Sequence, residues 1–171
     1  MINNELELES AINNVLIRAV DNTMEIALKK LLDIIEQTVY SYSATWVNGY
    51  GGDLGRTHEF YDTWDKTKAK VAKAFGGSKV EASILQTLLL TYHAPFSHGS
   101  IVEGGAIDKD DLNNIINKGL NESHMNFPAI EARPFWDEFE KWCDNNIIKI
   151  FQSECRKVGL NMKVGASYSI T

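Results

Sequence analysis

The sequence is poor in residues that build redox and metal centres. Only 2 cysteines occur among its 171 residues, and neither stands in the paired spacing typical of structural zinc sites. Cys143 and Cys155 lie in one segment of helical periodicity, so a rise of about 1.5 Å per residue places them roughly 18 Å apart. That separation excludes a disulfide between them. We expect two buried thiols in a reducing compartment.

Long hydrophobic runs and an excess of positive charge are also absent. No apolar stretch approaches the roughly 18 residues that a membrane span requires, and the acidic first residues lack the basic start of a signal peptide. The chain has 23 acidic and 17 basic residues, a formal net charge of −6. This charge disfavours general attraction to nucleic acid or anionic lipid. We expect a protein of a cytoplasm, or one assembled there, with no membrane partner.

The 3 prolines and 12 glycines are too few for a disordered or fibrous chain, and 44% of the residues are hydrophobic, as in ordinary globular proteins. At roughly 150 residues per domain, the length corresponds to about one domain. We divide the sequence into an N-terminal arm or helix extension at 1–20, a single α+β domain at 21–160 and a C-terminal tail at 161–171.

Helical periodicity dominates the N-terminal part of the chain. Apolar residues recur there at intervals of three and four, at Met24, Leu28, Leu31, Ile35, Val39, Tyr42 and Trp46. Residues 12–19 continue the pattern, so a helix is expected from near Ser10. The polar residues at 21–23 predict a break or a new N-cap, and the pattern fits one helix or two.

A second long helix is expected near the C-terminus. Pro134 suits a first helical position, and Gly159 would end the helix. Its apolar residues are Phe135, Phe139, Trp142, Cys143, Ile147, Ile150, Phe151 and Val158. Trp136 lies about 100° around the helix from Phe135. The apolar stripe is therefore wider than one buried face needs, which favours packing on both sides.

The middle of the chain is less regular. Residues 66–75 fit the first strand of a β-hairpin, with a turn at 76–78 and a strand over 80–90, but their lysines and alanines also favour a short helix. A helix is expected over 109–118, capped by Asp108 and ended by Gly119. Loops are expected at 47–56, 97–107 and 121–133. Six glycines in the first two loops are candidate docking positions, namely Gly49, Gly51, Gly52, Gly99, Gly104 and Gly105.

Patterns that support catalysis or metal binding are weak. His93 and His98 stand five apart across Pro95, unlike the i, i+4 pair of a helical metal motif. The glycines at 49–55 follow a helix and lack the phosphate-loop pattern. The lysines at 66, 68, 70 and 73 are interpreted as a solvated face rather than a single-strand binding surface. We expect no catalytic residue, no metal and no cofactor.

Two motifs and their order carry a family resemblance. Tyr92-His-Ala-Pro95-Phe96 precedes a glycine-rich loop, and Glu131-Ala-Arg133-Pro134-Phe135-Trp136 opens the last helix. Over residues 24–158 the chain resembles the HK97-like neck and tail-completion proteins of tailed bacteriophages. Gly55-Arg-Thr57 is similar to a third family segment, but here the glycine precedes the Arg-Thr pair.

This resemblance implies a fold, a function and a set of partners. The fold is α+β, with a long N-terminal helix, a small twisted antiparallel sheet and a long C-terminal helix packed on it. The function is that of a non-enzymatic virion protein, assembled in the host cytoplasm, whose ring in the neck completes the tail and joins it to the head. The partners are further copies of the chain, portal or adaptor proteins, and tail-tube or tail-terminator proteins. Genomic DNA would pass through the lumen without specific binding.

The candidate interface residues come from the two motifs: Tyr92, Pro95, Phe96, Arg133, Pro134, Phe135 and Trp136. The Arg133 segment fits either of two functions, a helix start with a core anchor or a direct contact with a neighbouring subunit. Rival functions are a tail terminator or minor tail protein, a small hydrolase using His93, His98 and Asp108, and a host-directed inhibitor.

Overall fold

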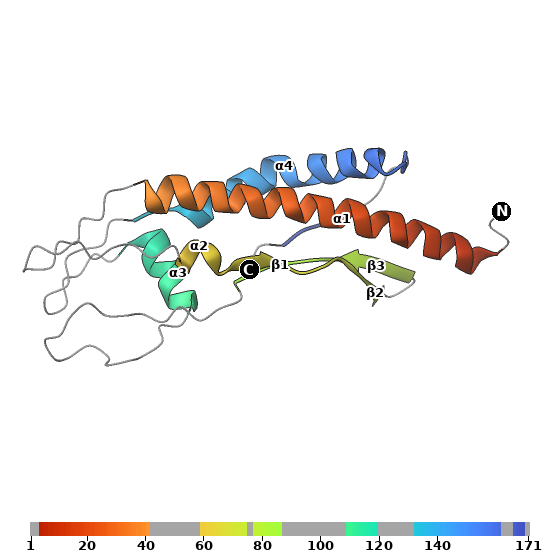
Figure 1. The fold of residues 1–171 in the computed structure, drawn as a ribbon, viewed down its shortest axis with the longest axis horizontal. Coiled ribbons are helices and arrows are strands. Elements are labelled where there is room, and N and C mark those ends of the chain that lie inside the picture. Colours follow the sequence, from red (N-terminus) through yellow and green to blue (C-terminus); the bar gives the residue numbers. More distant parts are fainter. Residues whose placement is uncertain are drawn as a thin grey trace, which may run out of the picture. The chain divides into compact units, whose positions relative to one another are not determined.

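The fold combines long helices with short paired strands. A computed structural model of the chain describes residues 4–41, 59–74, 77–86, 109–119, 132–161 and 166–169. In order, the elements are α1 (Glu5–Ile35), the π-helical turn η1 (Glu36–Tyr40), α2 (Glu59–Asp62), β1 (Trp64–Lys66), β2 (Lys70–Ala74), β3 (Gly77–Glu81), β4 (Ile84–Gln86), α3 (Lys109–Lys118) and α4 (Phe135–Lys157) (Figure 1). Strand β1 pairs with β4, and β2 pairs with β3. The α+β class predicted from the sequence is confirmed.

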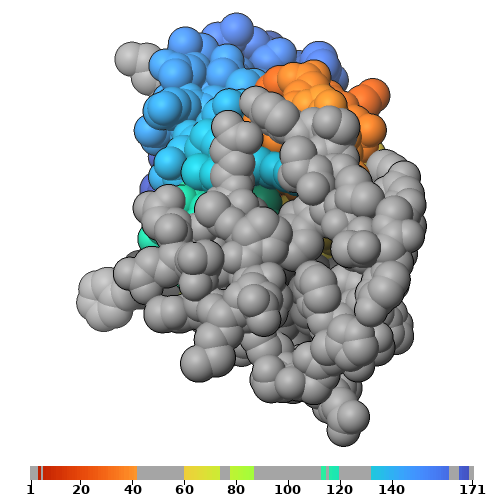
Figure 2. All heavy atoms as spheres, turned by 90° about the vertical axis from the view of Figure 1, so that its left-hand side faces the viewer, coloured from red at the N-terminus to blue at the C-terminus, as the bar shows by residue number. Residues whose placement is uncertain are grey.

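The chain divides into two compact units, each built from distant parts of the sequence. Unit 1 contains residues 1–30, 66–85 and 139–171, and unit 2 contains residues 31–65 and 86–138. The two long helices, α1 and α4, lie side by side over part of their lengths (Figures 1 and 2). None of the described helices is both long and apolar enough to cross a membrane.

Helix α1 is one continuous helix, which resolves the two alternatives left open by the sequence. Asn4 caps it, since its Oδ1 atom accepts a hydrogen bond from the Glu7 backbone N–H at 2.8 Å. The helix therefore begins at Glu5, earlier than the expected start near Ser10. Thr23 stays helical because its hydroxyl donates to the Ala19 carbonyl at 2.7 Å, which satisfies a buried polar group within the helix.

In unit 1, α1 packs against α4 through an apolar cluster centred on Ala19. Ala19 is buried with Phe151 and Cys155, and four partly buried residues pack around them, namely Leu16, Val20, Val158 and Leu160. Asn22 donates to the Glu154 carboxylate at 3.2 Å, so a polar link accompanies the apolar contact. The pKa of Glu154 is lowered, first by its hydrogen bond from Lys157.

Helix α4 ends where the sequence predicted. Gly159 has a φ of 90°, a left-handed conformation that glycine adopts without steric cost. The Leu160 N–H donates to the Cys155 carbonyl at 2.8 Å, and the Gly159 N–H donates to the Arg156 carbonyl at 3.1 Å. These two bonds form a Schellman motif, which satisfies carbonyls left open at the helix end.

Strands β2 and β3 form a β-hairpin in place of the alternative short helix, and Gly77 and Ser78, which were expected in the turn, belong to β3. Strands β2 and β3 are antiparallel, with Val71 opposite Val80 and Lys73 opposite Ser78. The expected single strand over 80–90 is corrected, because β3 ends at Glu81 and β4 begins at Ile84. The ladder is interrupted there, since the Ser83 N–H donates to the Thr67 hydroxyl at 2.9 Å. Residues 87–90 lie outside the described part of the chain.

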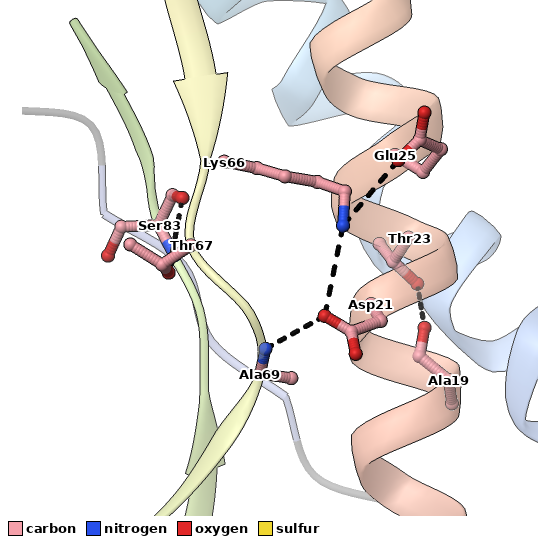
Figure 3. Close-up of polar contacts among 8 residues, drawn as sticks. All are labelled: Ala19, Asp21, Thr23, Glu25, Lys66, Thr67, Ala69 and Ser83. Atoms are coloured by element: carbon pink, nitrogen blue, oxygen red, sulfur yellow. Dashed lines mark hydrogen bonds and ion pairs between the residues drawn. The ribbon is translucent and has the colours of Figure 1, made fainter. Parts of the chain in front are cut away.

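The segment that leads into the hairpin is joined to α1 by polar contacts of Asp21. Its carboxylate accepts the Ala69 N–H at 2.8 Å and lies 3.9 Å from the Lys66 ammonium, which also pairs with Glu25 at 3.5 Å (Figure 3). Ala69 lies between β1 and β2, so Asp21 satisfies an N–H that the strand ladder does not. In unit 1 the hairpin and α4 lie on different sides of α1 (Figures 1 and 3).

Candidate functional site

The segment that carries the family resemblance lies in unit 2, where Arg133 joins two other elements. Its backbone N–H donates to the Ile116 carbonyl of α3 at 2.8 Å. Its guanidinium donates from Nη1 to the Val39 carbonyl of η1, also at 2.8 Å. Carbonyls at a helix end lack partners within the helix, so a charged donor there stabilises the end of η1.

Helix α4 receives its N-terminal cap from another helix. The Oδ1 atom of Asn117 in α3 accepts the Trp136 backbone N–H at 3.0 Å, and its Nδ2 atom donates to the Asp137 carboxylate at 2.8 Å. Asn117 is buried at 9% exposure. The first N–H groups of a helix have no partner within it. Asn117 therefore caps the N-terminus of α4 although it lies in a different helix.

Pro134 lies immediately before Phe135, the first residue of α4, and its carbonyl accepts the Glu138 N–H at 3.1 Å. The proline therefore occupies the capping position, one residue before the first helical residue, and not the first helical position that was predicted for it. The predicted start of the helix at this motif stands.

Phe135 anchors an aromatic cluster of four residues, Phe60, Trp64, Phe135 and Trp136. Phe135 is fully buried, at 0% exposure. Its ring lies 5.3 Å from that of Phe60, edge to face, and 6.3 Å from that of Trp64. Such pairs add about 0.5–1.5 kcal/mol beyond the area they bury.

Trp136 stacks on Trp64 with ring centroids 5.7 Å apart and an interplanar angle of 24°. Trp136 is the residue that widens the apolar stripe of α4 beyond one buried face, and this contact covers it. The predicted packing on both sides is therefore found at Trp136 within the chain itself.

A chain of side-chain hydrogen bonds borders the aromatic cluster. Asn113 donates to Gln86 at 3.0 Å, Gln86 donates to the Thr63 hydroxyl at 3.0 Å, and Thr63 donates to the Phe60 carbonyl at 2.9 Å. This series of hydrogen bonds links α2 and α3 to β4. The Trp64 indole N–H, by contrast, is buried and has no hydrogen-bond partner among the described residues, a cost of about 1–3 kcal/mol that the ring packing offsets.

The two thiols of unit 1 are unsuited to nucleophilic chemistry. Cys143 and Cys155 are both free and buried, as predicted. Burial, followed by the negative charges of Asp144 and Glu140, raises the pKa of Cys143 to about 11. Burial also raises the pKa of Cys155. Because the thiolate is the reactive form, both residues remain protonated near neutral pH.

Among the described residues, the lysines at 66, 68, 70 and 73 do not form an aromatic binding platform. Lys66 pairs with Asp21 and Glu25, and Lys70 lies 4.0 Å from Glu81. Trp64, two residues before Lys66, is buried at 8% exposure. Lys68, Lys70 and Lys73 are exposed, as a solvated face requires, whereas Lys66 departs from the prediction because it is half-buried against its two carboxylate partners.

Several candidate residues lie outside the described part of the chain. They are Tyr92, Pro95, Phe96, the six loop glycines, the four histidines and Asp108. Among the described residues, no group of three or more His, Cys, Asp or Glu side chains could hold a metal ion.

Sequence reasoning missed the partners of the Arg133 segment. Asn117, Phe60 and Gln86 carry no local signal, because each acts on an element distant in sequence. The only hint is that Asn117 is a poor helix former placed in the last turn of a helix.

Comparisons with known proteins add no further assignment. No family model, no curated protein and no solved structure matches this chain.

Proposed function

We propose that this chain is a non-enzymatic subunit of a bacteriophage neck. Copies of it would form a ring that completes the tail and joins it to the portal or adaptor proteins of the head. The observation that carries the proposal is the segment Arg133–Trp136, which bears the family resemblance. The Arg133 side chain donates to the Val39 carbonyl, and the rings of the next two apolar residues pack on Phe60 and Trp64 of unit 2. These contacts stabilise the fold, so they explain the residue types of the segment without a bound substrate.

The net charge of −6 supports this proposal independently. Carboxylates that line a ring repel the phosphates of DNA, so a genome could pass through with little adhesion. A nucleic-acid-binding protein would need the opposite balance of charge. The inert, buried thiols are likewise in keeping with a structural subunit.

The test is the mass of the purified chain in solution, measured by multi-angle light scattering. The chain would be measured alone, with the head-side connector proteins of its phage, and with the tail-tube protein. We expect a species many times the 19.2 kDa of one copy, either alone or once a head-side protein is added. A stable monomer that binds neither set of proteins would overturn the proposal.

The same mixtures separate the neighbouring functions. A tail terminator would bind the tail-tube protein and ignore the head-side connector. A hydrolase would show an activity that His98→Ala abolishes while assembly stays intact. In the proposed function, His98→Ala leaves the assembled mass unchanged.

A further inference from the structure

The residues that follow α4 have the sequence pattern of a β-strand. Apolar residues alternate there with small or polar ones, at Leu160, Met162, Val164, Ala166, Tyr168 and Ile170. Strict alternation over this length indicates a strand with one face covered. In the single chain, however, residues 166–169 belong to no strand, and all four are exposed. The segment therefore has the sequence of a strand but pairs with no strand among the described residues.

One side-chain bond positions this segment on its own chain. The Tyr168 hydroxyl donates to the carboxylate of Asp144 in α4, and Tyr168 is 39% exposed. No other hydrogen bond joins residues 166–169 to a described residue. The tyrosine side chain is thus held on α4, while the backbone groups of the segment are not bonded to the described part of the chain.

Strand β2 of unit 1 has an edge that suits such a segment. It pairs with β3 alone, and a two-stranded hairpin is only marginally stable by itself. In an antiparallel pair, every second residue directs its N–H and C=O groups away from the partner strand. No β2 residue bonds to a described element other than β3, whereas β3 is joined to α1 through Ser78. The outer edge of β2 is therefore open with respect to the described residues.

A strand added at this edge would lie beside β2, in the plane of the hairpin, and would leave the bonds between Ser78 and α1 in place. The register puts Val71 on the same face as Ser78. Although α1 meets that face at Ser78, Val71 is 45% exposed. The described residues therefore leave the β2 margin of the face uncovered, and an apolar side chain on an adjacent strand would cover Val71 there.

Charge favours one occupant of this edge over another. Lys70 and Lys73 are exposed on β2, so two β2 edges would meet with like charges, which disfavours their pairing. The sequence from 164 to 171 has no charged side chain. The C-terminal segment can therefore approach these lysines without repulsion.

We propose that residues 166–170 of one copy add to the open edge of β2 in the next copy, with Tyr168 opposite Val71. The five residues match the five of β2, and an aromatic ring beside a β-branched side chain is a favourable cross-strand pair. Tyr168 stays bonded to Asp144 of its own chain, so the edge that it joins belongs to a second copy. The contact is an addition of a strand to a sheet edge.

The proposal rests on the ring function proposed above and gives that ring one specific contact. The segment and the β2 edge are two different surfaces, so the contact between them is heterologous. Repeated heterologous contacts close into rings when the rotation between copies allows it.

The experiment joins the two surfaces through cysteines placed in separate copies of the full chain. One copy carries Ser167→Cys or Ser169→Cys, and the other carries Ala72→Cys. With Tyr168 opposite Val71, Ser167 faces Ala72 if the strands are antiparallel, and Ser169 faces it if they are parallel. Opposite residues have Cβ atoms about 4.5–5.5 Å apart, which is near the range that a disulfide requires.

Equimolar mixtures are oxidised in dilute solution and separated by electrophoresis without a reducing agent. The head-side protein is added if the natural chain assembles only in its presence. We expect one of the two mixtures to give a disulfide-linked pair of about twice 19.2 kDa. The control pairs Ala72→Cys with Ile26→Cys, a 38% exposed site on α1, and should give only background linkage. The natural Cys143 and Cys155 are buried and should not contribute.

A second measurement tests the ring of Tyr168 by light scattering. Tyr168→Ser should weaken self-association about tenfold, because the aromatic contact with Val71 is lost. Ile26→Ser is the matched control and should assemble as the natural chain does. Both positions are exposed, so the fold is expected to survive, which circular dichroism would verify.

Several results would overturn the inference. Linkage of Ser167→Cys or Ser169→Cys to itself, above the level of the Ile26→Cys control, would show that two segments pair. Linkage of Ala72→Cys to itself would show that two β2 edges pair. An internal disulfide in a chain that carries both cysteines would place the segment on its own hairpin.

The failure of this contact can be distinguished from failure of the proposed function. If no mixture gives a linked pair while the natural chain still assembles with the head-side protein, the contact is wrong and the neck function stands. If a linked pair forms but the chain binds no neck protein, the contact stands and the neck function is wrong.

Discussion

The two units reach a packed interior in different ways. In unit 1 the buried positions of α4 recur every four residues, at Phe139, Cys143, Ile147, Phe151 and Cys155. In unit 2 the interior centres on four aromatic rings from α2, β1 and α4. The first pattern spreads contact energy evenly along a helix face. The second concentrates it in a few residues whose neighbours are distant in sequence.

The comparison predicts the largest loss of stability at Phe135. Phe135→Ala removes a fully buried ring from contact with Phe60, Trp64 and Trp136, and we expect it to lower the free energy of unfolding by about 3–5 kcal/mol. Urea unfolding followed by tryptophan fluorescence measures it. In unit 1, Phe151→Ala removes a ring buried beside Ala19 and Cys155, and it should cost less. A larger loss at Phe151 would reverse the comparison.

The second prediction concerns the cap that α3 supplies to α4. Asn117→Ala leaves the Trp136 N–H and the Asp137 carboxylate without their partner, so we expect a loss of about 1–2 kcal/mol in unfolding free energy. Asn114→Ala, on the exposed face of the same helix, is the control and should change stability by less than about 0.5 kcal/mol. Equal effects of the two variants would show that the cap contributes nothing.

A smaller effect is expected at Asp21 in unit 1. Asp21→Ala removes the acceptor of the Ala69 N–H and should cost about 1 kcal/mol. Asp21→Asn keeps a side-chain oxygen and loses only the pairing with Lys66, whose distance is 3.9 Å, so it should cost a few tenths of a kcal/mol. Chemical denaturation of both variants separates the hydrogen bond from the charge. Equal losses would assign the effect to charge alone.

The smallest expected effect concerns the pKa of a tyrosine in the C-terminal segment. Tyr168 donates a hydrogen bond to Asp144, and this bond is the main reason that the pKa of Tyr168 is raised from 10.0 to about 12. A raised pKa in the folded state means that the contribution to stability is complete below pH 10. It is lost as the pH rises through about 12.

Ultraviolet titration of the natural chain minus that of Tyr168→Phe isolates this tyrosine. In Asp144→Asn the pKa should move back toward 10.0, the ordinary value. A Tyr168 pKa near 10 in the natural chain would show that this contact does not persist in solution.

Much of the Arg133 segment could be predicted from sequence. Pro134 and the apolar spacing after it located the start of α4, and Phe135 was expected to anchor the core. The cap from Asn117 and the bond from Arg133 to Val39 could not be predicted, because each joins residues far apart in the chain. Local patterns do not specify which distant element will be adjacent.

By itself, the sequence determined the elements whose signals are local. The bounds of α3 matched the expectation of 109–118, Gly159 ended α4, and β2 and β3 paired as the hairpin alternative predicted. Only the tertiary structure decided that Asp21, Asn22 and Thr23 remain inside one helix. Asp21 and Asn22 find their partners in Ala69 and Glu154. A polar cluster that suggests a break when it stands alone is stable within a helix once hydrogen-bond partners reach it from elsewhere in the fold.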